Sequence, residues 1–563
     1  MRDFFSAVIR KGIERIGASP DTVFQVEKPA DEKFGDVSTN AAMVLAKNLK
    51  KNPRQVAEEL IKAFDFPSGS IQKMEVAGAG FINFTLDPQF IRASLKSILL
   101  EKENYGKGTS GVGKRVIVEY LSANPTGPLS IGRGRGGVLG DTIANLFAAQ
   151  GYSVTREYYF NNAGRQMRIL GDSVRLRYRE LCGIKEDYPA EYYQGEYIRD
   201  IAEKIYEEHG NALMNSEDTA YFKDIAEGEI FEGIKATLKR LNIRHDSFFN
   251  ENTLYQVDSS LGESRNEVVI RLLRQKGFIY EKDGAVWFKT SELGKTMVDK
   301  ETKETKAVDT VLIKSNGEPS YRLPDIAYHT DKFDRKFDLM VNVFGADHID
   351  EYPDVLRALK VLGYDESRVK VAINQFVTTM QEGKAVKIST RRGNADTLDA
   401  LIDMVGADAT RFFFIMRSKD SHLNFDLDLA LKQSADNPVF YLQYAHARIC
   451  GILRTAEEKS GVKETEIKGE YLTALAAKEE MTLAKTLMRF PDAVLGALDG
   501  LEPQRLIGYL DKVAEDFHKF YQECRIVGEE NEIMQARLSL ALAAKQVLKN
   551  GLYMLGISAP EKM

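Results

Sequence analysis

Glycines cluster between residues 132 and 137, directly after a short hydrophobic segment and a Pro/Gly turn. Glycine allows a backbone to approach a phosphate closely, and the N-terminus of a following helix attracts negative charge. Segment 115–121 is rich in β-branched residues and predicts a buried parallel strand, and 152–160 predicts the next strand. Strand, glycine-rich turn, helix and strand predict a nucleotide-binding βαβ unit. The turn alone is a weak signal, because glycines also permit tight packing and helix starts.

Charged side chains stand at the ends of predicted strands, where a doubly wound sheet binds its ligands. Glu119 comes at the end of the segment 115–121, and Asp347 and His348 end a second predicted strand in VFGADH. Asp325 lies at the start of a predicted helix, after a proline. Each has a structural alternative: a solvated strand-end charge for Glu119, a carboxylate that favours a helix N-terminus for Asp325, and a hydrogen-bonded structural histidine for His348.

The elements that position these residues divide the chain into three units. Residues 1–110 predict a small α+β domain with a glycine-rich linker at its end. Residues 111–430 predict a parallel-sheet domain with an inserted, charged and helical subdomain at about 170–305. Residues 431–563 predict an all-α domain, because the pattern is nearly all helical from about 400 onward.

The bulk composition fits a multidomain globular protein. The 563 residues allow three or four domains, and 43% hydrophobic and 28% charged residues allow large buried cores. Cys182, Cys450 and Cys524 lie far apart without a CxxC pair, so neither a disulfide framework nor a cysteine zinc site is supported. Segment 1–17 predicts an amphipathic helix rather than a signal peptide, and no run of about 18 apolar residues follows. We therefore expect a cytoplasmic protein without a membrane partner.

Five stretches, in chain order and spread over the whole length, resemble the arginyl-tRNA synthetase family of class I tRNA ligases. They are EKPADEKFGDVSTNAAMVLAK (27–47), VEYLSANPTGPLSIGRGRGG (118–137) with REYYFNNAGRQ (156–166), VLIKSNGEPSYRLPDIAYH (311–329) with VNVFGADH (341–348), VKISTRRGNADTLDALIDMVGADATRFFFIMRS (386–418), and NPVFYLQYAHARI (437–449) with FHKFYQECRIV and VLKNGLYMLGISAP. One stretch alone could be chance, whereas five in order make coincidence implausible.

The resemblance implies a class I synthetase architecture. Its α/β core is a Rossmann-like parallel sheet, preceded by an α+β domain that binds the tRNA elbow and followed by an all-α helical bundle that binds the anticodon. It also implies the reaction ATP + L-arginine + tRNA(Arg) → AMP + diphosphate + L-arginyl-tRNA(Arg), through an arginyl-adenylate and with Mg²⁺ bound with the nucleotide. By the same resemblance, tRNA must be present before arginine is activated, and a monomer is expected.

The resemblance also implies roles for individual residues. Glu119 and Asp325 face the arginine guanidinium with Tyr321 beside it, and Ser122 and Asn124 hold the α-amino end. Carboxylates suit this role because a guanidinium is planar and offers five donors that they accept in bidentate geometry. Read without the family, Tyr321 could equally be a core aromatic residue. The positions implied for ATP are Ser130, Gly132, Gly134, Asp347, His348 and Ser389.

The sequence departs from the family at both ATP signatures. The first, His-Ile-Gly-His, is replaced here by Ser130, Ile131, Gly132 and Arg133. The second, Lys-Met-Ser-Lys-Ser, is replaced by Lys387, Ile388, Ser389, Thr390 and Arg391. In addition, Gly127 stands where some branches of the family carry a compensating lysine, and Asn162 where aspartate is usual.

Two interpretations follow from these departures. In the first, the enzyme works, and Arg133, Lys387 and Arg391 are its catalytic cations, with Arg135 and Arg392 as further candidates. Arginine is a permanent cation suited to phosphate, so it can stabilise charge on a reacting phosphorus. In the second, the chain is a paralogue that binds arginine or tRNA in a regulatory or repurposed role. The match over the whole length favours the enzyme.

Residues that contact tRNA are harder to assign. The net charge of −6 gives no overall argument for nucleic acid, so tRNA would be bound by local basic patches. The candidates are Tyr441, Tyr444, His446 and Arg448 near the C-terminal domain's start, and Phe34, Asn40 and Lys47 near the N-terminus. Packing of the aromatic residues against the core is an equal alternative for each one.

Overall fold

A parallel sheet forms the centre of the protein. The computed structural model describes residues 1–563 apart from 30, 163, 261, 299–302 and 389–395. Five strands lie in the order β16-β15-β5-β6-β7, and all neighbouring strands are parallel. They are β5 (Arg115–Glu119), β6 (Ser153–Phe160), β7 (Ser247–Asn250), β15 (Leu339–Gly345) and β16 (Val369–Asn374). The expected Rossmann-like parallel sheet is confirmed.

Three helices precede or connect the strands of this sheet. α5 (Ile131–Ala149) connects β5 to β6, α10 (Arg322–Asp334) precedes β15, and α11 (Tyr352–Leu362) connects β15 to β16. β5 is buried from its second residue to its last, as expected for a strand covered on both faces.

The glycines of α5 differ in what they do. A Cβ on Gly134 would lie 2.6 Å from the side chain of Leu398, and a Cβ on Gly140 would lie 2.2 Å from that of Tyr120. A Cβ on Gly132 would meet nothing within 4 Å. Close packing of α5 therefore explains Gly134 and Gly140, whereas Gly132 leaves open space at the start of the helix.

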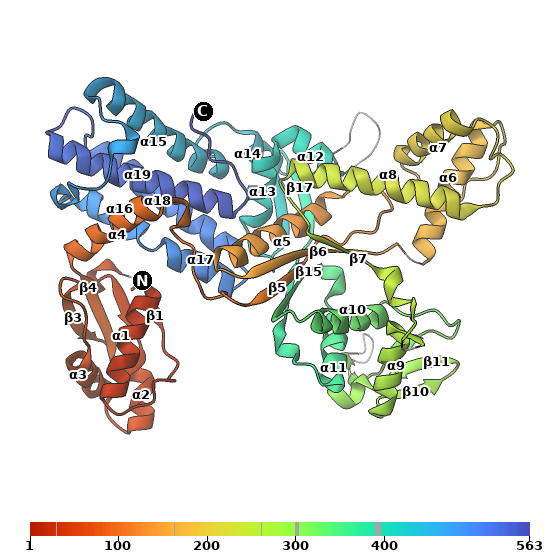
Figure 1. Ribbon diagram of the computed structural model, residues 1–563, viewed down its shortest axis with the longest axis horizontal. Coiled ribbons are helices and arrows are strands. Elements are labelled where there is room, and N and C mark those ends of the chain that lie inside the picture. The colour runs from red at the N-terminus through yellow and green to blue at the C-terminus, as the bar shows by residue number, and fades with distance from the viewer. Residues whose placement is uncertain (30, 163, 261, 299–302, 389–395) are drawn as a thin grey trace.

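The N-terminal part of the chain forms an α+β domain at one end of the molecule (Figure 1). Its four-stranded sheet has the order β1-β2-β4-β3, and the Phe5 and Phe84 rings pack 5.0 Å apart in its core. The elements are α1 (Arg2–Arg15), β1 (Val26–Glu27), β2 (Val37–Thr39), α2 (Ala41–Leu49), α3 (Pro53–Ala63), β3 (Ile71–Ala77), β4 (Phe81–Leu86) and α4 (Pro88–Glu101).

A helical bundle forms the C-terminal part, as the sequence predicts. It comprises α15 (Pro438–Ser460), α16 (Lys478–Leu487), α17 (Phe490–Asp499), α18 (Pro503–Glu523) and α19 (Asn531–Met554). α4 packs against α16 and α19, so the N-terminal domain is attached to the helical bundle and lies away from the parallel sheet (Figure 1). In the described part of the chain, no helix is long and apolar enough to span a membrane.

The segment expected as one insertion is divided in two. α6 (Arg165–Leu181), α7 (Glu196–His209) and α8 (Thr219–Arg240) form a helical lobe. α9 (Arg265–Gln275), β10 (Ile279–Lys282), β11 (Ala285–Phe288) and β14 (Thr310–Ile313) form a second lobe beside α10 and α11 (Figure 1). β7 lies between them in sequence and belongs to the central sheet, because it pairs with β6. The inserted subdomain expected at about 170–305 thus includes a strand of the central sheet, and its bounds stay a prediction.

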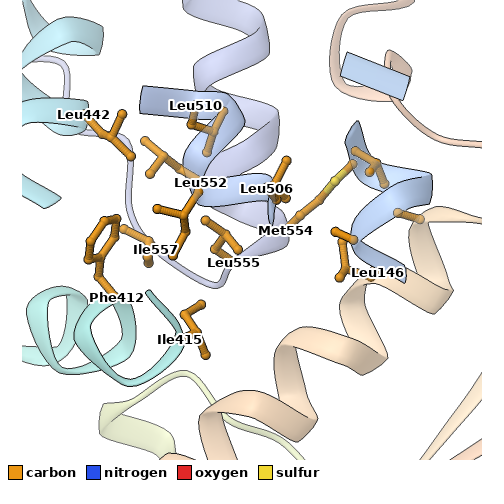
Figure 2. Packing of buried hydrophobic residues seen from close by; sticks show 14 of the residues in the cluster. Leu146, Phe412, Ile415, Leu442, Leu506, Leu510, Leu552, Met554, Leu555 and Ile557 are labelled. Carbon is orange, nitrogen blue, oxygen red and sulfur yellow. The ribbon is translucent and has the colours of Figure 1, made fainter. Parts of the chain in front are cut away.

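Short elements connect the sheet to the bundle. They are β17 (Val377–Gln381), α12 (Leu398–Val405), α13 (Ala407–Ile415), β19 (Leu423–Asp426) and α14 (Leu427–Leu431). β19 pairs in parallel with β17, so a strand interrupts the region expected to be nearly all helical. Figure 2 shows Phe412 and Ile415 of α13 packing toward Leu552, Leu555 and Ile557 at the end of the chain.

A buried arginine joins α13, α5 and the end of the chain. The Arg411 guanidinium donates to Asp141 Oδ2 at 2.7 Å and to the carbonyl of Leu241 at 2.7 Å. It also donates to the Leu555 carbonyl, at 2.9 and 3.1 Å. Arg411 and Asp141 are both almost fully buried, so each charge depends on the other for compensation.

Replacing Arg411 with Met should therefore destabilise the protein strongly. The variant leaves Asp141 buried without its partner, which typically costs about 3–5 kcal/mol. Arg240→Met is the control, since Arg240 makes ion pairs with Asp399 and Asp403 at an exposed position, where such pairs are worth about 0–1 kcal/mol. Urea denaturation of both variants measures the difference. Equal losses of unfolding free energy would contradict the assignment of Arg411 as a buried joint.

Candidate active site

A cavity of about 540 Å³ opens at the carboxyl ends of the central strands. This is the edge at which open α/β sheets bind their ligands, and the size suits a small-molecule site. Its walls come from the loop after β5, the start of α5, the start of α10, and the ends of β15 and β16. It brings together ten of the residues that the sequence singled out: Glu119, Ser122, Asn124, Ser130, Gly132, Arg133, Tyr321, Asp325, Asp347 and His348.

Glu119 reaches the cavity wall but is already bound on one side. Its Oε2 accepts a hydrogen bond of 2.7 Å from Lys332 Nζ, and its Oε1 accepts one of 3.3 Å from Ser122 Oγ. Glu119 is 4% exposed and Lys332 is 0% exposed. Glu119 is therefore not a solvated strand-end charge; it is half of a buried ion pair whose other side faces the cavity.

The Asp325 carboxylate lines the cavity with few groups to stabilise its negative charge. In the described part of the chain, no residue donates a hydrogen bond to its side chain, and its hydrogen bonds to Tyr321 and His329 are made by the main chain. Burial, and then the negative charge of Glu119, raise the pKa of Asp325 to about 8. A cationic ligand placed beside it would supply both the missing donors and the missing charge.

The loop after β5 holds its shape through unusual backbone angles. Leu121 and Ser122 have φ values of +71° and +35°, in the region that L-residues rarely adopt. Ser122 Oγ accepts a hydrogen bond of 3.1 Å from the backbone N–H of Tyr159, which ties the loop to β6. Such strain persists where surrounding contacts enforce it, and it is frequent at binding sites. Nearby, Tyr321 is 65% exposed at the mouth of the cavity, so it is not a core aromatic residue.

The start of α5 combines a cap, an open glycine and an exposed cation. Ser130 caps the helix by accepting a hydrogen bond of 3.4 Å from the N–H of Arg133. Gly132 and Arg133 line the cavity, and Arg133 is exposed. Within the described residues, Arg133 is the single lysine or arginine on the cavity wall. Gly134 does not line it, because it faces Leu398.

Arg135 has a structural role. Its guanidinium is 1% exposed and donates to the carbonyls of Gln375, Ser418 and Ser421 at 2.8–3.0 Å. Burial lowers the pKa of Arg135 to about 10. Its donors are directed at main-chain carbonyls, so the hypothesis that Arg135 supplies a cation to ATP is wrong.

The second signature lies partly outside the described residues. Lys387 is exposed and lines a second hollow of about 390 Å³, which shares Ser130 and Gly132 with the main cavity. Ser389 and Arg391, with Thr390 and Arg392, fall in the segment 389–395 that the structure does not describe.

Asp347 and His348 form η5 (Ala346–His348), directly after β15. The Nδ1 atom of His348 lies 3.2 Å from Glu351 Oε2, and this contact raises the pKa of His348. The His348 ring also packs against Phe344 at 5.3 Å. His348 thus lines the cavity and makes structural contacts as well, so neither interpretation of this histidine excludes the other.

Sequence reasoning missed two groups in the site. The first is Glu251, in η3 (Glu251–Leu254), which lines the cavity, is 6% exposed, and accepts a hydrogen bond of 3.0 Å from Tyr255 OH. Burial raises the pKa of Glu251, and no sequence pattern marks it. The second is the set His329, Lys332 and Asn342 behind the wall, of which the α10 members share one face with Asp325 at helical spacing. That spacing was readable from the sequence.

Other candidates have structural partners. Asn162 links α8 to η3, since its side chain donates to Glu227 and accepts from Asn252, both at 2.9 Å. His446 is 1% exposed, and its Nδ1 contacts the Pro560 carbonyl at 2.8 Å, so it is part of the bundle's core. Tyr444 is exposed and bonded to Arg448, and both remain candidates for nucleic-acid contact.

Comparison with known proteins gives consistent matches along the chain. Family models match residues 3–86 (arginyl tRNA synthetase N terminal domain), 94–428 (tRNA synthetases class I (R), catalytic domain) and 442–563 (DALR anticodon binding domain). Proteins named arginine–tRNA ligase from Chlorobium phaeovibrioides and Chlorobaculum tepidum are 60% and 58% identical, each over 100% of both chains. The solved arginyl-tRNA synthetase of Thermus thermophilus shares the fold, with a TM-score of 0.75 at 22% identity over 100% of both chains.

Replacing Asp325 with Asn should stabilise the ligand-free protein at neutral pH. Folding raises the pKa of this carboxyl from 3.8 to about 8, so the side chain favours the folded state less and less as pH rises from about 4 to about 8. The amide does not ionise. Its advantage should be absent near pH 4 and reach on the order of a few kcal/mol near pH 8. Urea denaturation across this range, with the exposed Asp334→Asn as control, measures it; an advantage that does not vary with pH would contradict the assignment.

Proposed function

The chain belongs to the arginyl-tRNA synthetase family, and from that premise we propose that the cavity is the place where its arginine and ATP react. The protein is an arginine–tRNA ligase, and L-arginine, ATP and tRNA(Arg) are its substrates. The comparisons support this reading, not that of a repurposed paralogue. The observation that carries the proposal is Asp325, an enclosed carboxylate that lacks a side-chain donor in the described part of the chain and lies beside Glu119.

We place the guanidinium of arginine against Asp325. There its N–H groups supply the donors that the carboxylate lacks, and its charge favours the ionised form. Glu119 Oε1 offers a second acceptor, and Tyr321 at the cavity mouth can cover the planar group. Ser122 and Asn124 follow Glu119 in the loop after β5 and also line the cavity, where they can bind the α-amino end.

This orientation directs the arginine carboxylate toward the start of α5. The carboxylate oxygen attacks the α-phosphorus of ATP, the bond to the bridging oxygen breaks, and diphosphate leaves, which gives arginyl-adenylate. The 2′- or 3′-hydroxyl of the tRNA end then attacks the arginyl carbonyl and releases AMP. The helix N-terminus and Arg133 supply positive charge beside the phosphates, and Lys387 approaches from the adjoining hollow. Ser130, Gly132, Asp347 and His348 surround the nucleotide in this proposal, with Ser389 and Arg391 as further candidates.

Mg²⁺ is proposed only as a companion of the nucleotide. The described residues contain no group of three or more His, Cys, Asp or Glu side chains that could hold a metal ion. Mg²⁺ bound with ATP keeps mainly phosphate and water ligands, so a cage of protein ligands is not required. The domains at 1–110 and 431–563 are proposed to bind the tRNA elbow and anticodon, and a cytoplasmic monomer is the proposed form.

The affinity for arginine should rise with pH between about 6 and 8. Below its pKa of about 8, Asp325 is mostly protonated and must lose its proton before it pairs with a guanidinium. Asp325→Asn should abolish this pH dependence and weaken binding by about 10–100-fold, the value of a charged hydrogen bond. Calorimetry with L-arginine and with its neutral analogue L-citrulline separates the charge from the shape. Arginine affinity that is unchanged in the variant would remove Asp325 from the site.

Arg133→His should lower the rate of tRNA-dependent arginine activation. Loss of one donor to a reacting phosphate typically costs about 10²–10³ in rate, and histidine restores the family's residue without its usual partners at Ser130 and Thr390. The KM for arginine should change little, because Arg133 lies at the phosphate end. Arg274→His, at an exposed position of α9, is the control. If instead Arg133 does not contact the phosphates and only places an unfavourable positive charge at a helix N-terminus, the variant should activate arginine as fast as wild type or faster.

A further inference from the structure

A fully buried ammonium group lies behind the wall of the cavity. Lys332 Nζ is 2.7 Å from Glu119 Oε2 and 2.7 Å from Asn342 Oδ1, and it lies 4.1 Å from the centre of the Tyr328 ring. Lys332 is 0% exposed. Burying a lysine is costly unless its charge is paired and its donors are bonded. The position therefore calls for an explanation beyond packing.

The hydrogen bonds around this ammonium have only one possible direction. The carbonyl of Asp325 can only accept, so His329 carries its proton on Nδ1 and donates across 2.8 Å. His329 Nε2 then accepts from Asn342 Nδ2 at 3.0 Å, which leaves Asn342 Oδ1 for Lys332. Burial, followed by the charge of Lys332, lowers the pKa of His329 to about 3, so this histidine stays neutral. One chain of bonds thus connects the main chain of Asp325 with the side chain of Glu119.

The fold places these residues opposite one another. Asn342 and Glu119 are register partners on β15 and β5, so their side chains project from the same row of the sheet. On α10, Asp325, His329 and Lys332 follow at intervals of four and three residues and share one helix face. The helix therefore presents its lysine to the sheet and its aspartate to the cavity.

Lys332 already provides an ammonium to Glu119 from the side opposite the cavity. A free lysine in the cavity would find Glu119 compensated, with its orientation fixed through Oε2. A guanidinium can still bind Asp325 and the remaining Glu119 oxygen. Because its donors lie in one rigid plane, it binds best to acceptors whose orientation is fixed. An ammonium is a compact point charge and gains little from fixed orientation.

We propose that Lys332 is a specificity-determining positioning residue, which favours arginine over lysine by occupying one oxygen of Glu119 and fixing the orientation of the other. The inference rests on the proposed function of the cavity. Lys332 itself does not contact the substrate; it acts through Glu119.

The test measures the ratio of L-arginine to L-lysine affinity by calorimetry with the full-length protein. In Lys332→Met, Glu119 loses its internal ammonium and can rotate, so arginine should bind more weakly and lysine more tightly. The ratio should fall at least tenfold. In steady-state charging of tRNA(Arg), the KM for arginine should rise more than kcat falls, because the phosphate end of the site is untouched.

Arg335→Met is the matched control. Arg335 directly follows the last residue of the same helix. It pairs with Glu157, the register partner of Glu119 on β6, through two hydrogen bonds of 2.7 and 2.8 Å. This variant leaves the fully buried Glu157 without its cation and should lower the melting temperature, but its arginine-to-lysine affinity ratio should stay within twofold of wild type. A merely structural role for Lys332 would make the two variants behave alike.

Lys332→Gln provides a second route if Lys332→Met does not fold. The amide keeps a donor for Glu119 without the charge, and the ratio should fall at least threefold. A ratio within twofold of wild type in either folded variant overturns the inference, as does failure of both variants to fold while Arg335→Met folds. If the wild type charges tRNA(Arg) and the Lys332 variants keep its arginine-to-lysine affinity ratio, this inference alone is refuted. If the wild type does not bind arginine, the assignment of the cavity is refuted.

Discussion

Charges buried between α10 and the central sheet must be compensated where they lie, and this constraint organises the active site. Glu119 and Glu157 are neighbours in one row of the sheet. Lys332 of α10 and Arg335, the residue directly after that helix, pair with them. Removing either partner of such a pair leaves a charge in a poorly polarisable interior, at a cost of several kcal/mol. The helix therefore cannot slide or rotate on the sheet. Its first turn, which carries Asp325 to the cavity, is fixed by pairs that lie about two to three turns further along the chain.

The same constraint divides the carboxylates by function. Glu157 and Glu119 form ion pairs with internal cations, whereas among the described residues Asp325 forms no ion pair and is held near Glu119 at the expense of its ionisation. A site for a cationic substrate needs such a group, because a carboxylate that is already satisfied gains little from a ligand. Under the proposed function, the stability that the buried Asp325 costs the ligand-free protein is recovered when the arginine guanidinium binds.

The sequence predicted many secondary-structure elements but not which side chains pair with one another in the fold. The β-branched segment before Glu119 and the glycine-rich turn predicted β5 and α5, because burial on both faces and close helix packing leave residue types that can be read directly. The ion pair of Glu119 with Lys332 could not be predicted, since it joins residues 213 positions apart in the sequence. Arg133 and Arg135 look alike in sequence, yet one is exposed and the other bonds main-chain carbonyls. β7 was missed because a four-residue strand between two lobes carries little pattern.

α5 extends from the wall of the cavity to the helical bundle. It has 19 residues, a length of about 28 Å at about 1.5 Å per residue. Ser130 and Arg133 stand at one end, and Asp141, about halfway along, is held by Arg411 together with the final segment of the chain. A helix of this length transmits displacement as a stiff rod. A displacement of the bundle that moves Asp141 would therefore reach Ser130 and Arg133 on the cavity wall through one continuous helix.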